Sequence, residues 1–294
     1  MVRQLWDRLA ALVAAAASVA CVALVLGIGV ALLLKAWPIV ASHHLGRLLL
    51  SSSWRPAAGE FGFYPFLVGT MWVSGLAMAV SIPVSLLTAL GLAEYAPARL
   101  RFFAKPVLDL LAAIPSVVFG LWGVLALVPL VRKLGASVGS PTTGYSVLAG
   151  GAVLAIMVLP FTIAVMQAVL RKVPLEAREA SFALGATKWQ TTKHVVLRAA
   201  YPGMLSAVVL GFSRAFGETM AVLMVVGNVP AVPRSVLDPA YPLPALIANN
   251  YGEMMSVPLY DSALMFAALI LLAAVVIFNI TAVTVLRGLE RRLA

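Results

Sequence analysis

Cysteine is almost absent from this chain of 294 residues, in which Cys21 is the sole example. An intramolecular disulfide and a cysteine-rich metal site are therefore excluded. Histidine occurs three times, as the pair His43 and His44 and as His194, which is too few and too scattered for a metal site. The sequence also lacks GxxxxGK followed by Ser or Thr, the loop that cradles nucleotide phosphates. We expect no metal, no resident cofactor and no catalytic activity of the chain itself.

Charged side chains are scarce, at 11% of the residues, whereas 62% of the residues are hydrophobic and the mean hydropathy is +1.02. Soluble globular domains contain about 25% charged and about 45–50% apolar residues. No soluble fold covers so much apolar surface, so part of the chain must face lipid. The composition predicts an integral membrane protein.

Six apolar stretches are long enough to cross a hydrocarbon core of about 30 Å, which takes about 20 helical residues. We expect these spans at Ala11–Leu34, Phe66–Gly91, Val107–Val131, Ser146–Leu170, Met204–Gly227 and Ser262–Leu286. No small-residue cleavage pattern follows the first stretch, so it is interpreted as a retained helix and not as a signal peptide. The predicted fold class is all-α, with six transmembrane helices.

The basic residues predict the orientation of these spans. With the N-terminus inside, fourteen Lys and Arg residues fall in cytoplasmic segments and six in outer segments, and Arg214 remains inside a span. This bias follows the positive-inside rule and places both termini in the cytoplasm. It also accounts for the net charge of +10. A nucleic-acid partner is not expected, because no basic patch is interleaved with aromatic residues.

The expected organisation has five main segments. They are a cytoplasmic N-terminus (1–10), a first transmembrane helix (11–34), an outer loop (35–65), a core of five transmembrane helices (66–286) and a cytoplasmic C-terminus (287–294). The core includes a cytoplasmic loop at 171–203 and an outer loop at 228–261 that is rich in proline. We expect this outer loop to be rigid and irregular, suited to docking a partner or to capping a cavity.

Proline also occurs inside the predicted spans, at Pro83, Pro115, Pro129 and Pro160. Membrane helices tolerate proline where neighbouring groups satisfy the freed carbonyl. Two interpretations stay open. The prolines bend helices that line a path through the membrane, or they are ordinary packing devices.

The cytoplasmic loop at 171–203 is predicted to hold two short helices. Pro174 suits the first position of a helix, Gly185 ends that helix, and Thr187–Leu197 forms a second one. The first helix has an apolar face made of Leu175, Ala180, Ala183 and Leu184. Such a helix pair suits a groove on another protein. Lying on the bilayer surface is the alternative.

The same loop carries a recognisable spacing. Glu179-Ala180-Ser181 is followed after three residues by Gly185 and, nine residues further on, by Val195-Val196-Leu197. This pattern resembles the EAA loop of ABC import permeases, although Ser181 replaces an Ala and Arg198 stands where the family has Pro. The resemblance implies a type I ABC importer permease fold, with a coupling helix seated on a separate ATP-binding subunit present in two copies. It assigns the contacts with that ATPase to Glu176, Glu179, Ala180, Leu184, Gly185 and Ala186.

The fifth predicted span contains two charged residues, Arg214 and Glu218. An Arg at the centre of a bilayer costs about 2.5–3.5 kcal/mol on insertion scales, so it calls for a functional explanation. Because Glu218 is four residues further on, both side chains are expected on one helix face. Three interpretations stay open. The two residues form a structural ion pair, or they contact a partner subunit, or Arg214 binds an anion that crosses the membrane while Glu218 adjusts the strength of that binding. The last interpretation is favoured, because a guanidinium fork fits tetrahedral oxyanions. Ser213 and Thr219 are predicted to line the same path.

Three stretches, Arg214–Val222, Glu94–Pro97 and Ile114–Gly123, resemble the PstC-type permease subunit of phosphate-specific ABC importers. With the EAA loop, the resemblance covers the chain from about Phe61 to the end. It implies phosphate transport across the cytoplasmic membrane of a prokaryote, in a heterodimer with a PstA-type permease. An extracytoplasmic phosphate-binding protein is expected to dock near Trp37–Pro65 and the 228–261 loop. A permease for sulfate, molybdate or tungstate is the nearest alternative, and a stand-alone secondary transporter or channel is the alternative of another class.

Replacing Gly185 with Val is expected to abolish transport without removing the protein from the membrane. A side chain at the turn blocks the close approach of a partner. Transport assays and immunoblots of the membrane fraction measure the two quantities in the same cells. Transport at the wild-type rate, or disappearance of the protein from the membrane, contradicts the prediction.

Overall fold

The computed structural model describes residues 2–253 and 256–293. Met1, Met254, Met255 and Ala294, which belong to the predicted N-terminal segment, outer loop and C-terminal segment, lie outside the described residues. The described residues form six helices that are long and apolar enough to cross a membrane. These are Leu9–Ser42, Tyr64–Tyr95, Ser116–Ser137, Val147–Arg171, Lys188–Phe216 and Tyr260–Thr284. The prediction of an all-α chain with six transmembrane helices is confirmed.

The spans are built from long helices and a few short ones. The membrane elements are α1 (Val2–Ser42), α3 (Tyr64–Leu90), α5 (Ser116–Trp122), α6 (Val128–Ser137), α7 (Val147–Arg171), α9 (Lys188–Thr191), α10 (Leu197–Phe216) and α13 (Tyr260–Leu293). π-helical turns at Gly91–Tyr95, Gly123–Leu127 and Thr192–Val196 extend α3, join α5 to α6 and join α9 to α10. The connecting elements are α2 (Leu45–Leu50), β1 (Trp54–Arg55), a 3-10 turn (Pro56–Ala58), β2 (Glu60–Phe61), α4 (Ala98–Ala113), α8 (Leu175–Ala183), α11 (Met220–Leu223) and α12 (Leu243–Asn250). The two strands pair antiparallel as a small hairpin.

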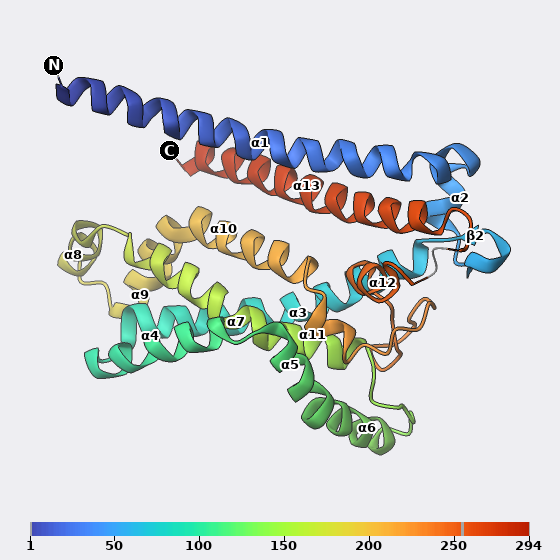
Figure 1. The fold of residues 1–294 in the computed structure, drawn as a ribbon. Coiled ribbons are helices and arrows are strands. Elements are labelled where there is room, and N and C mark those ends of the chain that lie inside the picture. The colour runs from blue at the N-terminus through green and yellow to red at the C-terminus, as the bar shows by residue number, and fades with distance from the viewer. Residues whose placement is uncertain (1, 254–255, 294) are drawn as a thin grey trace.

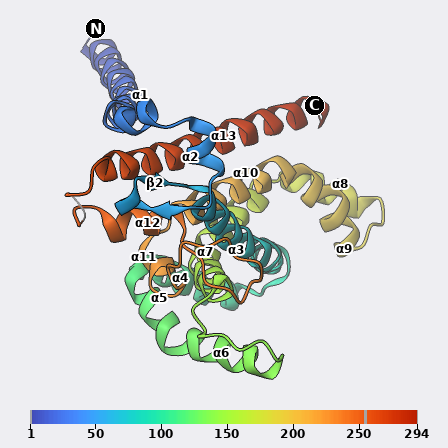
Figure 2. The same ribbon diagram turned by 90° about the vertical axis from the view of Figure 1, so that its right-hand side faces the viewer.

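Helices α3, α7 and α10 form a central bundle, and the pair α1 and α13 lies along one side of it (Figure 1). Helix α13 packs against both α1 and α10 and so joins the pair to the bundle. The start of α1, the end of α13 and helix α8 lie at one end of the molecule, and α2, the hairpin and α12 lie at the other (Figure 1). Figure 2 views the molecule from the end that carries α2, the hairpin and α12. This arrangement agrees with the predicted topology, in which both termini and the 171–203 loop are on the same side of the membrane.

Small residues bring α3 and α7 close together. A Cβ at Gly151 of α7 would lie 2.8 Å from Leu76 Cδ2 of α3, and one at Gly150 would lie 3.5 Å from Val73 Cγ1. Lipid tails are as apolar as the side chains, so helices associate in a membrane mainly through such close packing. Buried side chains from both helices, Val73 and Val153 among them, continue the contact into one apolar cluster.

Aromatic side chains close the end of the bundle opposite α8. The ring of Trp54 in the hairpin meets those of Phe63 and Phe66 edge-on, with centroids 5.4 and 4.9 Å apart. Phe66 also contacts Tyr241 of the 228–261 loop, and Phe63 contacts Phe266 of α13. Aromatic pairs at these spacings add about 0.5–1.5 kcal/mol each beyond their buried area. The cluster therefore fixes the hairpin and the loop to the long helices.

The predicted outer loop at 228–261 folds into the bundle and contains helix α12, an element that the sequence did not predict. The Leu243 amide donates a hydrogen bond to the buried Thr70 hydroxyl at 2.9 Å. At the start of α7, the Val147 amide donates to the Asp238 carbonyl at 2.9 Å. Irregular backbone at membrane depth persists only where the protein pairs its polar groups in this way. The loop thus caps one end of the bundle.

The predicted third span, Val107–Val131, is not one continuous helix. Helix α4 ends at Ala113, Ile114 and Pro115 have extended backbone with ψ of 128° and 142°, and α5 begins at Ser116. A proline disfavours helical conformation in the residue before it, which explains the break at Ile114. Hydropathy alone did not reveal this break, because the residues on both sides of Pro115 and Ser116 are mostly apolar.

The predicted fifth span, Met204–Gly227, is wrong at both ends. The helix begins at Lys188, because α9, a π-helical turn and α10 are continuous. The predicted second helix of the cytoplasmic loop, Thr187–Leu197, is therefore the first part of the fifth membrane helix and not a separate unit. At the other end, α10 stops at Phe216.

The early end of α10 has a local cause. Gly217 follows the last helical residue, and glycine disfavours helix by about 1 kcal/mol relative to alanine. The carboxylate of Glu218 accepts the Ala221 amide at 3.4 Å, which caps the short helix α11. Residues 217–219 thus interrupt what the sequence presents as one apolar run.

Gly151→Val is expected to destabilise the protein by about 1–3 kcal/mol, because the new side chain forces α7 away from Leu76 of α3. Gly75→Val is the matched control, since a Cβ at Gly75 meets no atom within 4 Å. Thermal unfolding of the purified full chain in detergent compares the two variants. Equal midpoints for both would show that close packing of α3 on α7 does not limit stability.

Candidate functional site

The chain between α7 and α10 forms a compact elbow, defined here as residues 174–191. Pro174 precedes α8, and the chain then turns at Gly185 into α9. The Thr187 hydroxyl accepts the Gln190 amide at 3.3 Å, while the Gln190 side chain accepts the Thr187 amide at 2.8 Å. This reciprocal capping box fixes the start of α9. The predicted helix after Pro174 and the predicted turn at Gly185 are confirmed.

Gly185 has a φ of +81°, in the left-handed region that favours glycine. Its amide donates to the Phe182 carbonyl at 2.9 Å, as at many helix C-termini. An ideal Cβ at this position meets no atom of the chain within 4 Å. Backbone conformation therefore opposes substitution at Gly185, and the open space beside it is accessible to a partner.

Large apolar side chains project from the elbow away from the bundle. Leu184 is 89% exposed, Leu175 is 63% exposed and Trp189 is 55% exposed. Exposed patches of large apolar side chains are typical of interaction sites. Of the predicted ATPase contacts, Glu176, Glu179, Ala180, Leu184 and Gly185 are exposed and Ala186 is half-buried.

Arg178 points from the elbow toward the bundle, a role that sequence reasoning missed. Its Nη1 lies 2.9 Å from Glu94 Oε1, and its Nη2 donates to the Leu170 carbonyl at 2.9 Å. Glu94 lies in the π-helical turn at the end of α3. The sequence matched Glu94 to a family pattern, but the positions of Glu94 and Arg178 are 84 apart in the chain. Spacing along the chain gave no signal that they meet.

Arg214 occupies the last turn of α10, and its side chain is exposed. Its guanidinium carbon lies 5.3 Å from the ring centre of Phe161 on α7. Both the ring face and the carbonyl end of the helix attract a cation. The structural ion pair with Glu218, one of the three interpretations, is not formed, since no described carboxylate lies within 4.0 Å of Arg214. The break at Gly217 removes the helical spacing on which that pair depended.

Glu218 is half-buried and lines a cavity of about 10 Å³ together with Thr70 and Ser74 of α3. This cavity is too small for a tetrahedral oxyanion. Thr219 is also half-buried, and its hydroxyl donates to the Gly217 carbonyl at 3.4 Å. The structure therefore places Glu218 and Thr219 at the helix break, and Glu218 forms no ion pair with Arg214.

Ser213 faces α13 and takes part in a helix contact. Asn279 of α13 donates from Nδ2 to the Ser213 hydroxyl at 3.0 Å, and that hydroxyl also lies 3.0 Å from the Val209 carbonyl. Polar pairs of this kind hold membrane helices together. Sequence reasoning missed Asn279, because a single polar residue in an apolar stretch does not indicate which residue it will contact.

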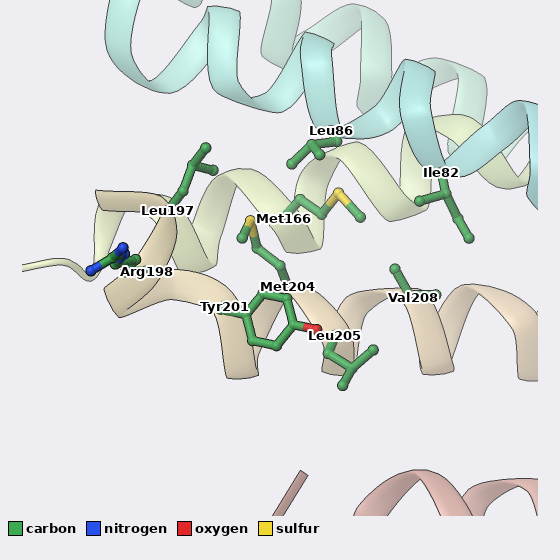
Figure 3. Close-up of a pocket in the computed structure, with 9 residues that line it drawn as sticks. All are labelled: Ile82, Leu86, Met166, Leu197, Arg198, Tyr201, Met204, Leu205 and Val208. Carbon is green, nitrogen blue, oxygen red and sulfur yellow. The ribbon is translucent and has the colours of Figure 1, made fainter. Parts of the chain in front are cut away.

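An apolar groove of about 620 Å³ lies between α3, α7 and α10 (Figure 3). Figure 3 shows Arg198 at one end of the groove and Met166 and Met204 in its middle. Apart from Arg198 and Tyr201 the lining is apolar, and an anion between these apolar side chains loses its hydration without gaining hydrogen bonds. The groove therefore differs in chemistry from the surface around Arg214.

Comparison with known proteins gives matches over most of the chain. The family described as "Binding-protein-dependent transport system inner membrane component" matches residues 81–294. A probable ABC transporter permease protein, YqgH, of Bacillus subtilis is 37% identical over 79% of this chain and 74% of its own length. The phosphate transport system permease protein PstC of Xylella fastidiosa is 36% identical over 75% of this chain and 72% of its own. A probable PstC of Methanocaldococcus jannaschii is 30% identical over 82% and 81%.

Two solved transporters share the fold. The inward-facing methionine ABC transporter MetNI gives a TM-score of 0.59 at 19% identity, over 77% of this chain and 97% of that chain. A bacterial ABC transporter involved in alginate import gives 0.57 at 16% identity, over 77% and 79%. At these identities the likeness concerns the fold alone. The predicted type I ABC importer permease fold is confirmed.

Proposed function

The chain belongs to the family of binding-protein-dependent transport system inner membrane components, and from this membership we propose that it imports inorganic phosphate. It acts as one transmembrane permease subunit of an ATP-driven importer in a prokaryotic cytoplasmic membrane. The observation that carries the substrate is the similarity to several permeases named for phosphate transport, at 30–36% identity over most of the chain. ATP hydrolysis belongs to a separate subunit, so the chain is not itself an enzyme.

The elbow at 174–191 is the proposed binding site for the ATP-binding subunit. Support comes from its exposed apolar side chains, chiefly Leu184 and Leu175, and from the open space beside Gly185. An apolar helix surface of this kind fits a groove on a partner protein. With two copies of the ATPase, one contacts this chain and the other contacts a second permease of the PstA type.

The proposed topology puts the elbow and both termini in the cytoplasm. An extracytoplasmic phosphate-binding protein then docks at the opposite end, on the outer segments at 35–65 and 228–261. Two facts support this assignment, namely the excess of Lys and Arg on the side of the elbow and the ordered cap that these outer segments build around Trp54 and Tyr241.

Arg214 is proposed to meet the anion during its passage, with Ser213, Glu218 and Thr219 shaping the surrounding path. The guanidinium is exposed in the isolated chain and has no carboxylate partner among the described residues, so its hydrogen-bonding groups are open to an anion. Glu218, at the adjacent helix break, lowers the affinity for the anion through repulsion. A conduit needs such modest affinity, because its cargo must leave again.

Phosphate uptake by proteoliposomes that contain the complete transporter tests the substrate. Radiolabelled phosphate is expected to enter only with ATP and the loaded binding protein, and excess sulfate, molybdate or tungstate is expected not to compete. Inhibition by one of those anions at equal concentration would assign the chain to another oxyanion. Uptake without any ATPase subunit would instead indicate a secondary transporter or channel.

Arg214→Gln and Glu218→Gln are each expected to lower phosphate transport by about tenfold or more, which corresponds to about 1.4 kcal/mol. The amide keeps most of the side-chain volume and removes the charge. Arg132→Gln is the matched control, because Arg132 is an exposed Arg on another helix, α6. If both variants assemble and transport at the wild-type rate, these residues have no role in the anion path.

A further inference from the structure

Three structural elements meet at the guanidinium of Arg178. From α8, Arg178 contacts Glu94 Oε1 at 2.9 Å and Oε2 at 3.1 Å, and it donates to the Leu170 carbonyl of α7 at 2.9 Å. Its side chain is 19% exposed and that of Glu94 is 8% exposed. Among the side chains that the structure describes, this is the one ion pair within 4.0 Å. This partly buried ion pair of Arg178 and Glu94 lies where the elbow joins the bundle.

The covalent chain by itself ties the elbow to only two of the three central helices. Residues 172 and 173 lead to it from α7, and its last part, α9, continues through a π-helical turn into α10. Helix α3 has no such connection. Its end meets the elbow through Glu94 on Arg178 and through Tyr95, whose ring lies 4.8 Å from Lys188 Nζ. The ion pair therefore adds α3 to the helices that the elbow holds.

The π-helical turn at Gly91–Tyr95 explains how Glu94 reaches this position. Such turns shift the side chains that follow them and are frequent at functional sites. Once buried, the Glu94 carboxylate has lost most of its water, so separating it from Arg178 leaves a poorly solvated charge. The pair thus resists being pulled apart when the elbow is displaced.

We propose that Arg178 and Glu94 form a coupling latch, which makes the elbow move as one unit with α3 and α7 when the ATPase closes. Arg178 is a positioning residue, since it acts through α3 and has no contact with the anion. The proposal rests on the proposed function, in which the elbow is the seat of the ATPase. It predicts that the pair sets how much transport each hydrolysed ATP produces, and not whether the ATPase binds.

The test uses the complete transporter in proteoliposomes, with ATP hydrolysis and phosphate uptake measured on the same vesicles. In Arg178→Gln and in Glu94→Gln, transport per ATP is expected to fall about fivefold or more, while hydrolysis stays within about twofold of the wild type. The exchanged pair Arg178→Glu with Glu94→Arg is expected to regain part of the lost ratio. Arg101→Gln, which removes an exposed charge from α4, should leave the ratio unchanged.

If Arg178 and Glu94 only stabilise the fold, phosphate transport and ATP hydrolysis fall together in these variants, and the ratio of transport to hydrolysis stays constant. That outcome overturns the latch, and so does an unchanged ratio at wild-type rates. Arg178→Lys keeps the charge and serves as a milder variant, and failure of every variant to assemble would assign the pair to folding and overturn the proposal as well. If the wild-type transporter itself takes up no phosphate, the proposed function fails and not the latch.

Discussion

A bilayer offers no water to a backbone amide, so each interruption of a membrane helix has to be paired within the protein. This constraint governs the arrangement of the whole chain. At the end opposite the elbow, the irregular loop that follows α11 hydrogen-bonds to Thr70 and to the start of α7. At the end of α10, the Glu218 carboxylate accepts the Ala221 amide and so pairs a backbone group after the break at Gly217. The interrupted helices are stable because neighbouring elements complete them.

The interruptions lie close to the residues that carry the proposed function. Arg214 is exposed in the last turn before the break in the fifth membrane helix, and α11 after that break packs on α5, which begins after the break at Pro115. At the other end, the same helix continues without interruption into the elbow. A displacement of the elbow is therefore carried along one continuous helix to the neighbourhood of Arg214.

The sequence predicted the number of spans, the turn at Gly185 and the resemblance to ABC import permeases, because hydropathy and short spacings are local properties. It did not predict the breaks at Ile114 and Gly217, since hydropathy averages over single residues that stop a helix. It also missed Arg178 with Glu94 and Ser213 with Asn279. Both pairs join residues far apart in the chain, and only tertiary packing brings them together. The proposed path residues Arg214 and Glu218 were singled out by their charge, but their mutual arrangement depended on the break.

The central claim is that a soluble ATPase holds this membrane chain at the elbow, and site-specific cross-linking tests it most directly. A single cysteine at Leu184, in a chain whose exposed Cys21 is replaced by Ala, carries a cleavable photoreactive label in the assembled transporter. The account predicts an adduct with the ATP-binding subunit that blocks transport, with transport restored when the link is cleaved. Adducts formed only with lipid, or equal labelling of the ATPase from a cysteine at exposed Val138 on the opposite side, would contradict it.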